Sequence, residues 1–106
     1  MNPWILLTIA GISEIAWALT LKFSEGYTKP LMVVINLIVM VFSLVLLSIA
    51  LKSIPIGTAY AVWTAIGATG VAIVGMMFLG ESSAFIRIFF ILVIIIGIIG
   101  LKFTTP

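Results

Sequence analysis

One acidic residue, Glu14, stands inside a long run of apolar residues, and its type and position suit ion chemistry. The run extends from about Pro3 to Leu21, with Glu14 near its middle. A helix rising about 1.5 Å per residue would place this carboxyl near the centre of a bilayer core about 30 Å thick. A charged side chain at that depth costs on the order of 2.5–3.5 kcal/mol, so it indicates a functional site by default.

The Glu14 carboxyl can hold either a proton or a cation. Burial makes the ionised form costly, and a second Glu14 from a partner chain would couple the two carboxyls. Competition between a proton and a cation for one carboxylate is the minimal machinery of a proton-coupled cation exchanger. The alternative is a protonated glutamic acid that only makes a structural hydrogen bond.

Glu14 has suitable neighbours on its own helix face. Gly11 lies three residues before it and Trp17 three residues after it. We expect Gly11 to leave room beside the carboxyl. The Trp17 ring offers an aromatic face to a cation and one N–H donor.

Hydroxyl and indole groups in two further runs could hold the carboxylate in place. Ser43 lies at mid-depth in the second run, with Asn36 seven residues earlier on the same face. Tyr60 and Trp63 lie three residues apart in the third run. Simpler roles exist for each type: serine bonding its own backbone, tyrosine anchoring at the interface, and tryptophan filling the core. Trp63 also lies only about 10 Å into its run, so it matches the depth of Glu14 only if a helix is longer, tilted or shifted.

Four membrane-spanning helices are needed to position these residues. The chain has 106 residues, of which 64% are hydrophobic and 8% charged, whereas a soluble domain is about 25% charged. This composition excludes an ordinary soluble domain, and it excludes intrinsic disorder, which requires low hydrophobicity. We predict one all-α domain over 1–106, with transmembrane spans at about 3–21, 31–51, 57–79 and 84–101.

Other classes of protein fit the residues poorly. No basic side chain precedes the first run, unlike a signal peptide, and the runs do not alternate as β-barrel strands do. The chain has no Cys and no His, which argues against a metal, a cofactor or an enzyme. A dispersed net charge of +2 does not favour a nucleic-acid partner.

The remaining charges lie at or near the span ends and barely specify an orientation. Lys52 and Lys102 fall on the side of the N-terminus, against Lys22, Lys29 and Arg87 on the other side. By the positive-inside rule, this near-tie predicts insertion both ways up. The alternative is one orientation that another cue sets.

A single copy supplies too few helices to enclose a polar pathway easily. Transporters commonly place their site between two inverted halves, and two copies in opposite orientations would recreate that pair. We therefore predict an antiparallel, dual-topology homodimer. Gly97 and Gly100 in the fourth span permit close helix approach and form the predicted dimer contact. Glycines there, and at positions 67, 70 and 75 in the third span, could equally serve packing within one chain.

Three stretches, residues 11–18 (GISEIAWA), 21–28 (LKFSEGYT) and 54–64 (IPIGTAYAVWT), carry a family resemblance. The chain resembles the small multidrug resistance family of bacterial four-helix exporters over essentially its whole length. The resemblance implies an antiparallel homodimer in the bacterial cytoplasmic (inner) membrane that exchanges protons for cations. It implies that Glu14 binds proton and substrate alternately, within a polar network of Trp17, Ser43, Tyr60 and Trp63.

Three features are similar to the guanidinium exporters of that family. These are Trp17, where multidrug exporters typically have glycine, Gly11 before the glutamate, and the ending Gly100-Leu101-Lys102. The resemblance thus implies export of guanidinium and small substituted guanidinium cations by alternating access. The family usually has Gly-x-Gly at a bend in the third helix. Here the sequence is Ala65-Ile66-Gly67, which leaves Gly67 as the expected bend.

Alternative functions stay open at this point. The chain could be a broad multidrug exporter of quaternary ammonium and other lipophilic cations, or a non-transporting membrane assembly subunit. It could also be one subunit of a heterodimer, although the even charge count argues against that. A narrow site beside Trp17 favours guanidinium, because its N–H groups match a carboxylate whereas a quaternary ion has none.

Overall fold

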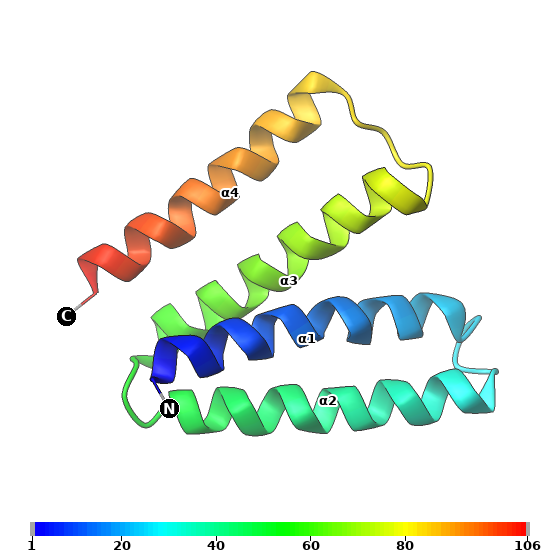
Figure 1. The fold of residues 1–106 in the computed structure, drawn as a ribbon, viewed down its shortest axis with the longest axis horizontal. Helices are drawn as coiled ribbons and strands as arrows, with labels where there is room; N and C mark the ends of the chain where they lie inside the picture. Colours follow the sequence, from blue (N-terminus) through cyan, green and yellow to red (C-terminus); the bar gives the residue numbers. More distant parts are fainter. Residues whose placement is uncertain (1, 106) are drawn as a thin grey trace.

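The computed structural model describes residues 2–105 as four α-helices joined by short loops (Figure 1). The helices are α1 (Pro3–Phe23), α2 (Pro30–Ala50), α3 (Ile56–Phe78) and α4 (Phe85–Thr104). All four are long and apolar enough to cross a membrane. The prediction of an all-α chain with four membrane-spanning helices is confirmed, and each helix ends within three residues of the span limits given above.

Proline and glycine mark several helix ends. Pro3 and Pro30 begin α1 and α2, where the missing N–H costs no helix hydrogen bond. Asn2 precedes α1, and its side-chain oxygen accepts a hydrogen bond from the Trp4 backbone N–H at 2.8 Å. Gly80 follows the end of α3 with φ +70°, a left-handed conformation that glycine adopts without steric cost.

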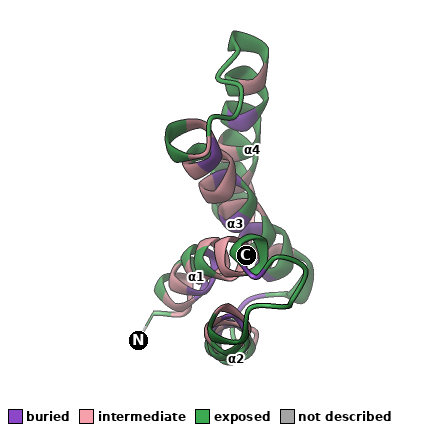
Figure 2. Ribbon diagram, turned by 90° about the vertical axis from the view of Figure 1, so that its right-hand side faces the viewer, coloured by how far each residue is buried: buried purple, intermediate pink, exposed green. Residues whose placement is uncertain are grey.

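Helix α1 lies between α2 and α3, while α4 packs along α3 (Figure 1). The molecule is flat, at 43 × 35 × 19 Å, because α4 does not close over the α1–α2 hairpin. The shortest dimension is about two helix diameters. Helix α4 is consequently exposed over most of its surface (Figure 2), and Ile91 is its one buried residue.

The apolar core lies at one end of the molecule, where α1 and α3 begin and α2 ends. Its buried members are Leu7, Leu47, Ala50, Ile54, Ala59 and Val62. The C-terminal part of α4 packs against this cluster through Ile98 and Leu101. The hydroxyls of Thr58 and Thr105, 3.2 Å apart, join the start of α3 to the end of α4.

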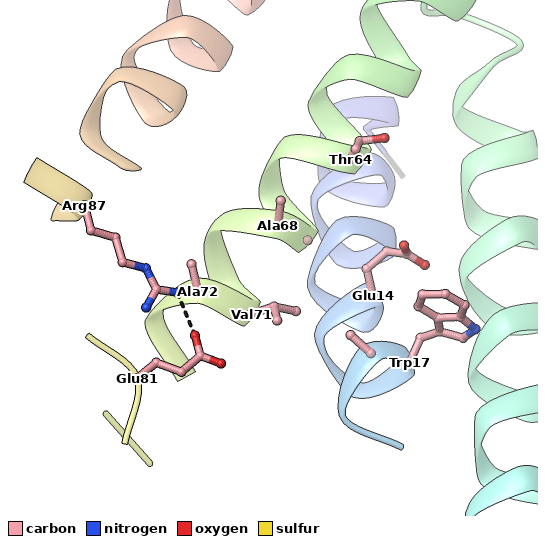
Figure 3. Close-up of a pocket in the computed structure, with 10 residues that line it drawn as sticks. Glu14, Trp17, Thr64, Ala68, Val71, Ala72, Glu81 and Arg87 are labelled. Atoms are coloured by element: carbon pink, nitrogen blue, oxygen red, sulfur yellow. Dashed lines mark hydrogen bonds and ion pairs between the residues drawn. The ribbon is translucent and has the colours of Figure 1, made fainter. Parts of the chain in front are cut away.

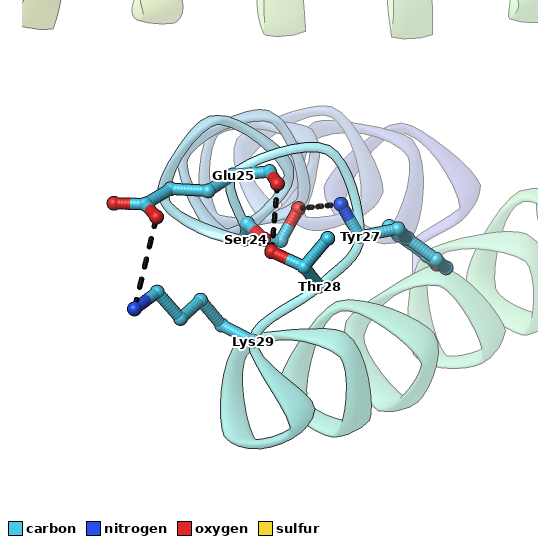
Figure 4. A network of polar contacts seen from close by, with 5 residues as sticks. All are labelled: Ser24, Glu25, Tyr27, Thr28 and Lys29. Atoms are coloured by element: carbon cyan, nitrogen blue, oxygen red, sulfur yellow. Dashed lines mark hydrogen bonds and ion pairs between the residues drawn. The ribbon is translucent and has the colours of Figure 1, made fainter.

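The loop between α1 and α2 is a tight turn at the opposite end (Figure 4). Glu25, Gly26 and Tyr27 all have left-handed φ angles, of 50°, 75° and 68°. The buried Ser24 hydroxyl accepts a hydrogen bond from the Tyr27 N–H at 3.0 Å, and the Thr28 hydroxyl donates to the Glu25 carbonyl at 2.8 Å. These bonds hold the strained turn that joins the two helices of the hairpin.

Candidate functional site

A cavity of about 450 Å³ opens between α1, α3 and the start of α4 (Figure 3). Small side chains on α3, including Ala68 and Ala72, create much of the space. Ten residues line it: Glu14, Trp17, Ala18, Thr64, Gly67, Ala68, Val71, Ala72, Glu81 and Arg87. The membrane glutamate predicted from the sequence therefore lines an open cavity.

Glu14 and Trp17 both line this cavity from α1, one turn apart, and their side chains extend to the same side of the helix (Figure 3). Gly67 of α3 lies directly against Glu14, since a Cβ built on Gly67 would lie 2.7 Å from the Glu14 Cβ. Glycine at 67 thus lets α3 approach α1 at the turn that carries the carboxyl. Glu14 of α1 and Gly67 of α3, both singled out from the sequence, are therefore in contact.

Ser43 joins three helices beside the Glu14 turn. Its fully buried hydroxyl donates to the Ala10 carbonyl of α1 at 2.9 Å and accepts a hydrogen bond from the Trp63 indole N–H, also at 2.9 Å. Ala10 precedes Glu14 by one helical turn, and Ser43 also neighbours the Glu14 side chain. Ser43 bonds α1 rather than its own backbone, so the simpler interpretation does not hold.

The depth difference between Trp63 and Glu14 is resolved by the register of α3. Gly67 lies level with Glu14, and Trp63 is one turn nearer the start of the helix. The Trp63 indole reaches Ser43 on α2 from that position. No lengthening or shift of a helix is required.

Two of the predicted site residues have other surroundings. Tyr60 is 58% exposed, lies outside the cavity lining and contacts Trp63 with ring centroids 5.4 Å apart. The space beside Gly11 is occupied by Ile66, because a Cβ built on Gly11 would lie 2.8 Å from the Ile66 Cβ. Gly11 therefore permits close packing of α3 on α1, and it does not leave room beside the carboxyl as the sequence suggested.

Asn36 supports the site from α2, on the face that it shares with Ser43. Its side-chain amide donates to the Trp17 carbonyl at 2.8 Å and to the Thr20 hydroxyl at 3.0 Å. Its oxygen accepts a hydrogen bond from the Tyr27 hydroxyl at 2.7 Å. Asn36 is almost completely buried, so these bonds fix the turn of α1 that carries Trp17.

Sequence reasoning missed Glu81 and Arg87, which line the far side of the cavity. Both charges lie near span ends, and their position gives no sign that they face the same space as Glu14. The fold of the α3–α4 loop brings them there, and helical periodicity does not extend through a loop. Across residues 2–105, no group of three or more His, Cys, Asp or Glu side chains could hold a metal ion.

The glycines of α3 and α4 have different surroundings. Cβ atoms built on Gly67, Gly70 and Gly75 would meet Glu14, Ile15 and Glu81, so these glycines serve packing within the chain. Cβ atoms built on Gly97 and Gly100 would meet no described atom of residues 2–105 within 4 Å. The two glycines of α4 are exposed on the outer surface.

Comparison with known proteins gives the same family as the sequence motifs. The model of the Small Multidrug Resistance protein family matches residues 2–94. The chain is 50% identical over 102 residues to a guanidinium exporter of Escherichia coli O6:H1, covering 96% of this chain and 97% of the relative. It is 52% identical over 99 residues to a guanidinium exporter of Yersinia pseudotuberculosis, covering 93% and 95%. Since the match runs through nearly the whole chain, this multi-pass membrane protein belongs to the small multidrug resistance family.

Proposed function

We propose that this chain is a proton-coupled antiporter that exports guanidinium and small substituted guanidinium cations by alternating access. The observation that carries the proposal is that Glu14 and Trp17, one turn apart on α1, both line an open cavity. The guanidinium exporters to which the chain is about half identical support guanidinium as the cation.

The site suits a planar cation that shares its carboxylate with a proton. Two parallel N–H groups of guanidinium match the two oxygens of a carboxylate, and an aromatic face adds cation–π attraction of about 0.5–2 kcal/mol. A proton on Glu14 removes the negative charge that binds the cation. Each carboxyl therefore binds either a proton or a cation, but not both at once. A proton gradient then drives the cation in the direction opposite to proton flow.

We propose further that the transporter is an antiparallel homodimer, inserted in both orientations in the bacterial inner membrane. The exposed apolar surface of α4 supports this arrangement, as do Gly97 and Gly100, which leave space for close approach of another helix. A second, inverted copy would enclose the open cavity and add a second Glu14. Inverted pairs of this kind are a common basis of alternating access.

Transport by purified protein in liposomes with an imposed pH gradient tests the function. We expect guanidinium uptake driven by the gradient, and its loss in Glu14→Gln, which keeps the shape of the side chain and removes its charge. Glu25→Gln is the matched control, because Glu25 lies in the exposed α1–α2 loop and its loss should leave transport unchanged.

The same assay separates the alternatives. A Glu14→Gln variant that exchanges guanidinium for protons at the wild-type rate would overturn the mechanism. Transport of a large quaternary ammonium ion without guanidinium transport would favour a multidrug exporter. The absence of transport of both cations would favour a non-transporting subunit.

A further inference from the structure

The cavity that holds Glu14 has a second carboxylate at its far side, already paired with a guanidinium. The Arg87 Nη2 lies 2.6 Å from the Glu81 Oε1, and the Arg87 Nη1 donates to the Ser82 carbonyl at 2.9 Å (Figure 3). Glu14 lies against Gly67 and Glu81 against Gly75. These glycines are eight positions apart on α3, so the points at which the two glutamates contact the helix are about 12 Å apart along its axis.

The Glu81 carboxyl packs against the end of α3, at Gly75. Gly75 has no side chain where this carboxyl lies, and a Cβ built there would overlap with the Glu81 Oε1. The Glu81 N–H donates to the Gly75 carbonyl at 3.1 Å, which fixes the backbone of the loop to the helix. The carboxylate therefore packs against the end of α3, and its backbone is bonded to the helix without any contribution from Arg87.

The ion pair between Arg87 and Glu81 is open to water, so it can break and re-form. The two side chains of the pair are 33% and 45% exposed, and ion pairs exposed to water and salt are held weakly. The group that Arg87 presents to Glu81 is itself a guanidinium. Only its Nη2 bonds this carboxylate, because Nη1 donates to the Ser82 carbonyl. A free guanidinium can replace that single bond with two parallel N–H bonds to the carboxylate.

We propose that Glu81 is a second guanidinium-binding carboxylate, at the far side of the cavity from Glu14, and that Arg87 is a tethered competitor that occupies it between transport events. An arriving guanidinium displaces Arg87 and then moves on to Glu14. The inference rests on the proposed function in taking guanidinium as the cation. It adds a selection step, because a quaternary ammonium ion has no N–H donors with which to replace Arg87 on Glu81.

Equilibrium binding of radiolabelled guanidinium to the purified protein at low salt tests this competition. In Arg87→Gln, which removes the competitor, we expect about one more guanidinium bound per chain than in the wild type. The gain should persist when Glu14→Gln is added and disappear when Glu81→Gln is added. Lys29→Gln is the matched control, since it removes the partner of Glu25 at 3.7 Å, neither residue lines the cavity, and it should add no binding.

An Arg87→Gln variant that binds no more guanidinium than the wild type would overturn the proposal, as would a gain that survives Glu81→Gln. If Arg87→Gln does not fold, Arg87→Met replaces it, because methionine keeps an unbranched side chain and removes the positive charge. A folded Arg87→Met variant without added binding also overturns the proposal. Failure of the proposed function differs visibly: wild-type protein would show no guanidinium–proton exchange, whatever Arg87→Gln binds.

Discussion

Ser43 determines where the Trp63 indole lies, because its single hydroxyl connects α3 to α1. It accepts the indole N–H and donates to the Ala10 carbonyl, one turn before Glu14. A buried N–H or carbonyl that loses its partner costs about 1–3 kcal/mol. The position of this hydroxyl therefore affects both the stability of the chain and the shape of the site.

We predict that Ser43→Ala lowers the melting temperature in detergent and reduces guanidinium transport about tenfold, since the Trp63 indole loses its acceptor. Ser48→Ala is the control, because Ser48 lies on an exposed face of the same helix and should change neither quantity. Melting by circular dichroism and flux in liposomes measure the two effects. Equal behaviour of both variants would contradict the role of Ser43.

The residues of the site could be predicted by type, but their partners could not. Glu14, Trp17, Ser43 and Trp63 are polar or aromatic groups in apolar runs, and this contrast identifies them in the sequence. The acceptor for Ser43 is a backbone carbonyl, which every residue possesses and no sequence distinguishes. Ile66 fills the space beside Gly11 because of the register between α1 and α3, which neither helix's sequence specifies by itself.

Helix α3 is the element that brings the site together, and its small residues set how closely it approaches α1. We predict that Gly67→Ala reduces transport at least tenfold, because the new Cβ would meet the Glu14 side chain at 2.7 Å. Overpacking of this kind costs about 1–3 kcal/mol. Gly57→Ala is the control on the same helix, since its Cβ would meet no described atom within 4 Å.

Gly57→Ala should preserve transport, because alanine favours a helix over glycine by about 1 kcal/mol. Flux measured at equal amounts of folded protein compares the two variants. Full activity of Gly67→Ala would show that α3 and α1 need not approach closely at Glu14.

The helices could be predicted from the sequence more readily than their arrangement. Long apolar runs bounded by proline, glycine and lysine give the four helices. Helix α4 is apolar around most of its surface, so no stripe of residues indicates which face meets α3. Its position depends on local contacts such as the pairing of Thr58 with Thr105 and of Glu81 with Arg87.

At the scale of the whole molecule, the even distribution of basic residues makes orientation sensitive to one charge. We predict that Ser53→Lys increases the share of chains with the α2–α3 loop on the cytoplasmic side, and that Ser83→Lys increases the opposite share. The chain has no cysteine, so Thr105→Cys provides a unique site for a membrane-impermeant thiol reagent. The Thr105→Cys variant without an added lysine should react from both sides of the membrane, and labelling from one side alone would contradict dual topology.

The position of α4, beside α3 and against the core end, has a consequence for biosynthesis. The bonds from Asn36 to Trp17 and from Ser43 to Ala10 join segments that the ribosome makes before α3 is complete. The contacts of α4 involve α3 and the core end, and the first hairpin requires none of them. A nascent chain can therefore assemble in the order of its synthesis, and the last helix to leave the ribosome is the one with the most surface to offer a neighbour in the lipid.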